Sequence, residues 1–115
     1  NPLLEPSPCM DSILIVTTTL PTMEAAKLLA QQLIDERLAA CVQIQGGVQS
    51  IYRWDGTLCN DTEVLLSAKT TATQWQPIEA FIKTHHPYQL PEIIAFRPAE
   101  YSQAYGQWVN EETRP

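Results

Sequence analysis

The two histidines of this chain are adjacent, in a segment whose side chains could bind a metal ion or move a proton. His85 and His86 are followed by Pro87-Tyr88-Gln89-Leu90-Pro91-Glu92, which adds a phenol and a carboxylate. Imidazole is the side chain that most readily binds a transition metal or transfers a proton near neutral pH. We therefore expect any chemistry of this chain to gather here.

Adjacent histidines are poorly placed to bind the same metal ion. Neighbouring side chains diverge by about 100° on a helix and point to opposite faces on a strand. Helical spacing places His85 on the apolar stripe with Ile78, and His86 on the polar side with Glu79. Two imidazoles at a helix C-terminus can instead complement the helix dipole, with Pro87 ending the helix. The sequence alone favours this structural role, because a tight metal site needs three or four convergent ligands.

A metal site would need ligands from elsewhere in the chain. Cys41 is one candidate, since a thiolate combined with imidazole suits copper or zinc; the alternative is a small buried hydrophobic residue. Glu92 and the hydroxyl groups of residues 17–19 are further candidates. We take His85, His86 and Cys41 as the candidate metal ligands, with copper or zinc as the ion these residue types suit.

A second group of side chains could line a polar cleft. The group comprises Lys69, Tyr88, Glu92 and Trp54. A lysine beside a carboxylate can support acid–base chemistry, although the same pair often forms a structural salt bridge. The sequence contains no glycine-rich phosphate loop and no nucleophile motif. We therefore expect no enzyme and no catalytic residue.

The composition limits the classes of protein. A chain of 115 residues forms one ordinary domain, and its formal charge of -6 disfavours nucleic acid. Three widely spaced cysteines indicate a reducing, cytoplasmic setting, and the longest apolar run, residues 13–16, is too short to span a membrane. Residues 1–10 contain three prolines and no periodicity. We expect them to be a disordered or artificially added leader before a single domain at 11–115.

The apolar pattern predicts an α+β domain. Residues 13–19 form a β-branched run typical of a central strand, and a helix should follow from an N-cap at Thr22. A second helix should begin near residue 73, and residues 93–96 should form the last core strand. A terminal helix is indicated by an apolar stripe at Tyr101, Ala104, Tyr105 and Trp108. With a hairpin between the first two helices, this order matches the ferredoxin-like split βαβ sandwich.

The predicted hairpin, residues 41–69, is long for so small a domain. It should turn at Asp55-Gly56 and bulge or bend at Gly46-Gly47. Residues 41–54 would extend about 45 Å at the usual rise of a strand, whereas a domain of this size has a radius of gyration of about 13 Å. The hairpin should therefore overshoot the domain and expose apolar side chains, namely Val48, Ile51, Tyr52 and Trp54.

Several motifs in order along the chain resemble a known family. They are Glu36-Arg37-Leu38-Ala39-Ala40-Cys41, Ile51-Tyr52-Arg53-Trp54-Asp55-Gly56, Glu63-Val64, Lys69-Thr70, and the segment from His85 to Glu92. Together they resemble the CutA divalent-cation tolerance proteins over essentially the whole domain.

This resemblance implies a ferredoxin-like subunit, a homotrimer built by the long hairpins, and a role in tolerance to divalent metals. It also implies copper binding through His85, His86 and Cys41. Some members have a cysteine where this chain has Thr18, and a hydroxyl is a poor replacement for a soft thiolate ligand. The alternative function is a small-ligand sensor or scaffold like the PII signalling proteins, with clefts between subunits.

The overshooting hairpin predicts an oligomer, because exposed strand edges and apolar side chains tend to pair with another chain. Size-exclusion chromatography with light scattering measures the molar mass in solution. We expect a multiple of the 12.9 kDa chain mass, and a monomer would refute the prediction.

Overall fold

The computed structural model describes residues 10–114, which form one α+β domain. The expected leader therefore lies outside the described residues, except for Met10. In chain order the elements are β1 (Ile13–Leu20), α1 (Met23–Asp35), β2 (Cys41–Trp54), β3 (Thr57–Thr71), a 3-10 turn (Ala72–Gln74), α2 (Trp75–His85), β4 (Ile94–Phe96) and α3 (Gln103–Glu112).

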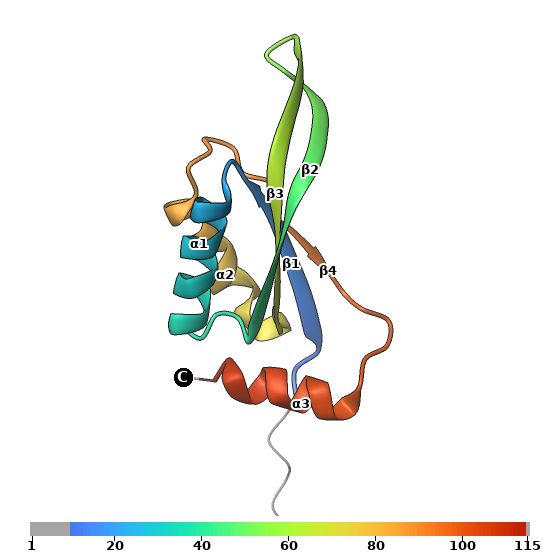
Figure 1. Cartoon of the computed structure of the whole chain (residues 1–115). Helices are drawn as coiled ribbons and strands as arrows, with labels where there is room; N and C mark the ends of the chain where they lie inside the picture. Colours follow the sequence, from blue (N-terminus) through green and yellow to red (C-terminus); the bar gives the residue numbers. More distant parts are fainter. Residues whose placement is uncertain (1–9, 115) are drawn as a thin grey trace, which may run out of the picture.

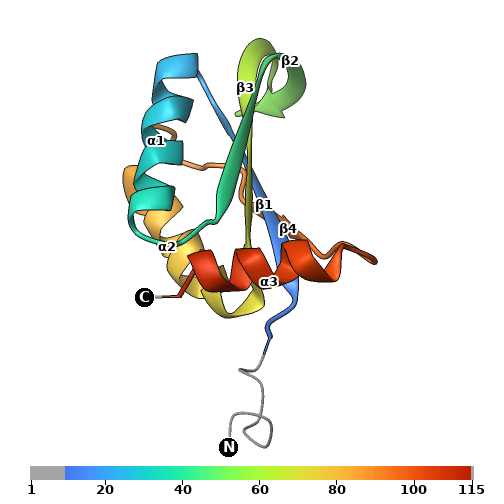
Figure 2. The ribbon, with the colours of Figure 1, turned by 60° about the horizontal axis from the view of Figure 1, so that its bottom comes forward.

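The four strands form one antiparallel sheet in the order β2-β3-β1-β4. Helices α1 and α2 cover one face of this sheet, while α3 crosses the end at which β1 begins (Figures 1 and 2). Strand β3 lies between β1 and β2, which is the split βαβ connection. The predicted ferredoxin-like fold is confirmed.

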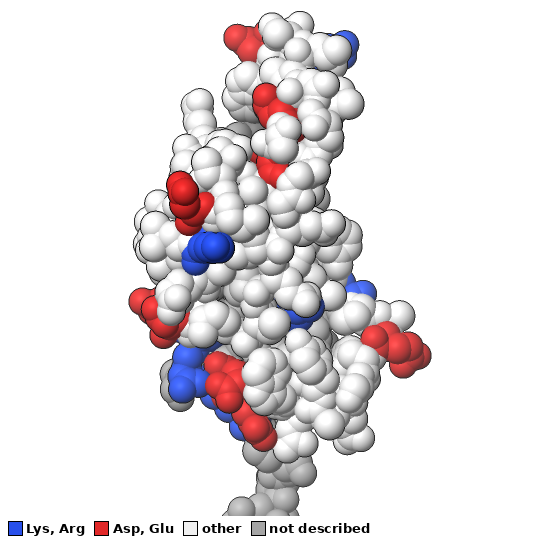
Figure 3. Space-filling view, viewed as in Figure 1, with Lys and Arg blue, Asp and Glu red and all other residues white. Residues whose placement is uncertain are grey.

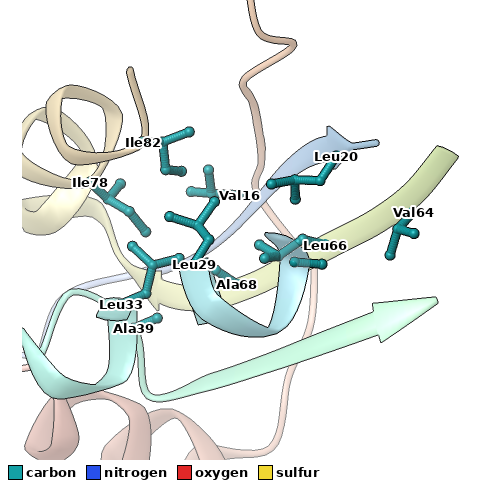
Figure 4. Packing of buried hydrophobic residues seen from close by; sticks show 11 residues of the cluster. Val16, Leu20, Leu29, Leu33, Ala39, Val64, Leu66, Ala68, Ile78 and Ile82 are labelled. Atoms are coloured by element: carbon teal, nitrogen blue, oxygen red, sulfur yellow. The ribbon is translucent and has the colours of Figure 1, made fainter. Parts of the chain in front are cut away.

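The core lies between the sheet and the first two helices. Val16 and Leu66 project from neighbouring strands, and Leu33, Ile78 and Ile82 meet them from α1 and α2 (Figure 4). All five side chains are fully buried. Alternate positions of β1 and β3 supply the sheet's share of the core, as the two-residue period of a strand requires.

The first helix begins where the sequence predicts. The hydroxyl of Thr22 accepts a hydrogen bond of 3.1 Å from the amide of Ala25, so Thr22 is the N-cap. In α2, Pro77 is the third residue, within the first turn, where amide groups lack helical partners. No helix in the described part of the chain is long and apolar enough to cross a membrane.

The hairpin extends well beyond the body of the domain (Figure 1). Asp55 and Gly56 form its turn with φ values of 51° and 77°, and the register shifts between Gln45 and Val48, at the predicted bulge. The molecule is 63 Å long, and its radius of gyration is 16.3 Å, compared with about 13 Å for a compact domain. Ile51 is 66% exposed. The predicted overshoot is confirmed.

One expectation about the C-terminal part was confirmed and one was wrong. Strand β4 forms as predicted, with Ile93 and Ala95 packed against the core, and its edge position leaves Ile94 and Phe96 about half exposed. The aromatic stripe of α3 faces outward, and the buried face carries Gly106, Val109 and Asn110 instead.

Polar contacts set the orientation of α3. The Asn110 amide nitrogen donates to the carbonyl of Asp11 at 3.0 Å, and the Asn110 amide oxygen accepts from the backbone of Asp11 at 2.9 Å. A Cβ atom at Gly106 would lie 2.7 Å from the ring of Tyr101, so this close packing requires glycine. Hydrophobic periodicity alone does not detect these contacts.

Two leucines of α1 test the location of the core. Leu33 is fully buried and Leu28 is 61% exposed, so Leu33→Ala removes core packing while Leu28→Ala is a matched surface control. We expect Leu33→Ala to lower the free energy of unfolding by about 2–5 kcal/mol and Leu28→Ala to change it by less than about 0.5 kcal/mol. Urea denaturation at one fixed protein concentration measures both; equal effects would contradict this core.

Candidate functional site

The end of α2 places the two histidines in different surroundings. The helix ends at His85, and His86 is extended, with φ -82° and ψ 138°. Proline disfavours the helical conformation in the residue before it, so Pro87 explains this change. The extended backbone turns the His86 ring inward, where only 9% of the residue is exposed. The expectation that His86 lies on the polar side was wrong, because helical spacing no longer applies after His85.

Both ring nitrogens of His86 have protein partners. Nδ1 accepts a hydrogen bond of 3.1 Å from the amide of Tyr88, which places the ring proton on Nε2. Nε2 lies 2.8 Å from the carbonyl oxygen of Thr19 and 3.1 Å from the hydroxyl of Thr18. Burial lowers the pKa of His86, while the Thr19 carbonyl and the charge of Glu63 oppose that shift. His86 is therefore a neutral side chain that ties the loop after α2 to the end of β1.

His85 keeps one ring nitrogen free for a ligand. Its Nδ1 lies 2.9 Å from the carbonyl of Phe81 and donates to it, and its ring stacks on that of Phe81 at a centroid distance of 3.9 Å. The side chain is exposed. Histidines that bind metals commonly donate their other N–H to a backbone carbonyl, which fixes the tautomer and the ring orientation. His85 therefore has the geometry of a single metal ligand.

The three candidate metal ligands do not converge within one chain. Cys41 pairs with Lys69, which lies beside Ile15 of β1, whereas His86 contacts Thr18 and Thr19 near the other end of that strand. In residues 10–114, no group of three or more histidine, cysteine, aspartate or glutamate side chains could hold a metal ion. These residues therefore do not form a tight metal site within a single subunit.

A groove of about 680 Å³ lies between the hairpin and the loop after α2. In Figure 1 this loop rises beside the hairpin. The groove is lined by Thr19, Ser50, Ile51, Tyr52, Trp54, Cys59, Glu63, Pro87, Tyr88, Gln89, Leu90 and Glu92. It brings together three of the four predicted cleft residues, Trp54, Tyr88 and Glu92.

Lys69 is not among the residues that line the groove. Its ammonium group donates to the side chain of Gln43 at the other end of the sheet. Tyr52, Cys59 and Glu63 were not among the predicted cleft residues, yet all three line the groove. The available signal was the two-residue period of β3, which places Cys59 and Glu63 on one side of the hairpin.

Two tyrosines of the groove bind carboxylates. The hydroxyl of Tyr88 donates to Glu63 at 2.7 Å, and that of Tyr52 donates to Asp61. Burial and the bond to Glu63 raise the pKa of Tyr88, and the bond to Asp61 raises the pKa of Tyr52 to about 12. Both phenols therefore stay protonated at physiological pH, and each acts as a hydrogen-bond donor.

This ferredoxin-like domain, with its long hairpin and the groove beside it, is similar to the CutA proteins. The family model of the CutA1 divalent ion tolerance protein matches residues 14–112. A divalent-cation tolerance protein CutA of Thermus thermophilus is 43% identical over 99 residues, which cover 86% of this chain and 96% of that protein. The chloroplastic CutA of Arabidopsis thaliana is 38% identical, and the match covers 88% of this chain and 56% of that longer protein.

Solved structures agree with these matches. The crystal structure of CutA1 from Ehrlichia chaffeensis superposes with a TM-score of 0.88 at 34% identity, and the match covers 93% of this chain and all of that one. The chain belongs to the CutA1 divalent ion tolerance family.

The burial of neutral His86 predicts that stability depends on pH. Unfolded His86 has the ordinary pKa of 6.5 and the folded value is lower, so below pH 6.5 the unfolded chain binds more protons. The free energy of unfolding should therefore decrease as the pH is lowered below 6.5, by up to about 1.4 kcal/mol per pH unit from this group. Urea unfolding at pH 7.5 and 5.5 measures this decrease. Between these two pH values the free energy of unfolding should decrease less in His86→Asn than in the wild type.

His85→Asn is the matched control, because His85 is exposed. It should retain the pH dependence of the wild type. An unchanged pH dependence in His86→Asn would contradict the assignment of a buried neutral imidazole.

Proposed function

We propose that the chain is the subunit of a cytoplasmic, non-enzymatic homotrimer that contributes to tolerance of divalent copper. Membership of the CutA1 family supports the role in divalent-cation tolerance. Copper is the proposed ion because an imidazole nitrogen is a favoured ligand for it. The ion is cargo of this protein, bound weakly from solution.

The free Nε2 of His85 is the observation that carries the proposed copper contact. Its Nδ1–H is fixed by the carbonyl of Phe81, so Nε2 carries the lone pair that can bind a metal ion. His86 would have to give up a hydrogen bond before it could bind metal. The hydroxyl of Thr18 also contacts His86, and a hydroxyl is a poor ligand for copper compared with a thiolate. A single imidazole per subunit favours weak binding.

The exposed hairpin supports the proposed trimer. Ile51 and Leu58 are 66% and 68% exposed. Because side chains alternate along a strand, both lie on the face of the hairpin opposite Trp54. Strand β2 is also an edge of the sheet, with unpaired backbone groups along its outer side. Such a surface is stabilised when another copy covers it, and three copies related by a rotation axis can cover one another's hairpins in a closed ring.

Isothermal titration calorimetry with copper tests the proposed contact. The protein should carry Cys9→Ser, so that a thiol outside the described residues does not compete. We expect His85→Ala to weaken copper binding by about tenfold or more, because it removes the free nitrogen. Cys41→Ser should leave binding unchanged, since Cys41 lies far along the sheet.

A double variant, His85→Ala with His86→Ala, covers the case in which the two rings exchange roles. Copper binding unchanged in this double variant would remove the histidines from the site and contradict the proposed contact. Circular dichroism of each variant checks that the fold is retained.

A further inference from the structure

The walls of the groove are aromatic and apolar. Tyr52 and Trp54 of the hairpin and Tyr88 of the loop supply three rings, and Leu90 adds aliphatic surface. The volume of about 680 Å³ lies within the range of sites for small organic molecules, about 300–1,000 Å³. The groove is therefore large enough for an organic ligand, and its walls suit one with an apolar body.

The charged groups of the groove all have one sign. Of the residues that line the groove, Glu63 and Glu92 are the charged ones, and no lysine or arginine lines it. Figure 3 shows acidic side chains along the hairpin on one face of the molecule, with a basic group near its tip. The groove should therefore attract a positive charge.

Glu63 is a buried carboxylate that forms no ion pair with any of residues 10–114. Only 8% of the residue is exposed, and its side chain accepts a hydrogen bond from the neutral hydroxyl of Tyr88. The ion pairs in the described part of the chain are Arg37 with Glu112 and Lys83 with Glu79. Burying a carboxylate without a positive partner costs free energy. A cation in the groove would recover part of that cost.

Aromatic faces next to a buried carboxylate are the features that recognise organic cations. An ammonium or guanidinium group over the face of a tryptophan or tyrosine ring is attracted by the ring's electrons. A metal ion prefers three or more closely spaced ligand atoms, which the groove does not offer. The apolar walls instead suit the carbon atoms attached to a charged nitrogen.

We propose that the groove binds a small organic cation, with its charged nitrogen near Glu63 and its apolar part against Trp54, Tyr52 and Tyr88. This site is separate from the proposed copper contact, since His85 does not line the groove. The inference goes beyond metal tolerance and assigns the protein a second ligand class. Copper binding and cation binding can therefore fail independently.

Calorimetry with choline tests this inference on the assembled protein in the presence of a metal chelator. The control ligand is 3,3-dimethylbutan-1-ol, which has the shape of choline without its charge. We expect choline to bind about tenfold more tightly than the alcohol. Equal affinities, or no binding of choline, would overturn the proposal.

Variants locate the site. Glu63→Gln keeps an acceptor for Tyr88 and removes the charge, so it should reduce choline binding to the level of the alcohol. Glu100→Gln is the matched control, because it removes the same charge from an exposed position that does not line the groove. Trp54→Leu serves as a second variant outside the core. Choline binding that survives both Glu63→Gln and Trp54→Leu would place the ligand elsewhere and overturn the proposal.

Discussion

The antiparallel ladder between β2 and β3 is the constraint on which the rest of this structure depends. It runs from the pair Cys41 and Lys69 to the pair Trp54 and Thr57. Its inner half belongs to the sheet beneath α1 and α2, while its outer half stands away from the body (Figure 1). Backbone pairing continues on both sides of the bulge between Gln45 and Val48, but the outer half gains little from burial. One face of that half supplies a wall of the groove. Its other face and its open edge expose the apolar side chains and backbone groups that favour association between chains.

The turn at the end of α2 supplies the other wall. Pro87 holds His86 in an extended conformation, and the bonds of His86 to Thr19 and to the Tyr88 amide fix the loop that follows. Tyr88 can then reach Glu63 on the hairpin. The two histidines therefore have different roles. His86 fixes the loop that forms one wall of the groove, and His85 has a ring nitrogen, Nε2, available to a ligand. A segment that the sequence presents as one metal site contains a structural residue beside a candidate ligand.

Local signals predicted most of the fold. The N-cap at Thr22, the turn at Asp55-Gly56 and the bulge after Gln45 depend on backbone preferences of a few residues, and all three are present. The outward stripe of α3 was not predictable from periodicity, because the contacts between Asn110 and Asp11 join residues 99 positions apart. The contact between Tyr88 and Glu63 was also not predictable from local patterns, since it joins residues 25 positions apart. From the sequence we could predict several of the residues that line the groove, but not which of their side chains contact one another.

We infer that the outer half of the hairpin is completed by another copy of the chain. Hydrogen–deuterium exchange of residues 48–54 in the assembled protein tests it most directly. In an isolated subunit, the amides of this edge strand that point away from β3 have no partner and exchange quickly, while those that point toward β3 are protected. If another copy covers this edge, we expect the outward amides to be protected too. Exchange of the outward amides at the rate of an unstructured peptide would contradict it.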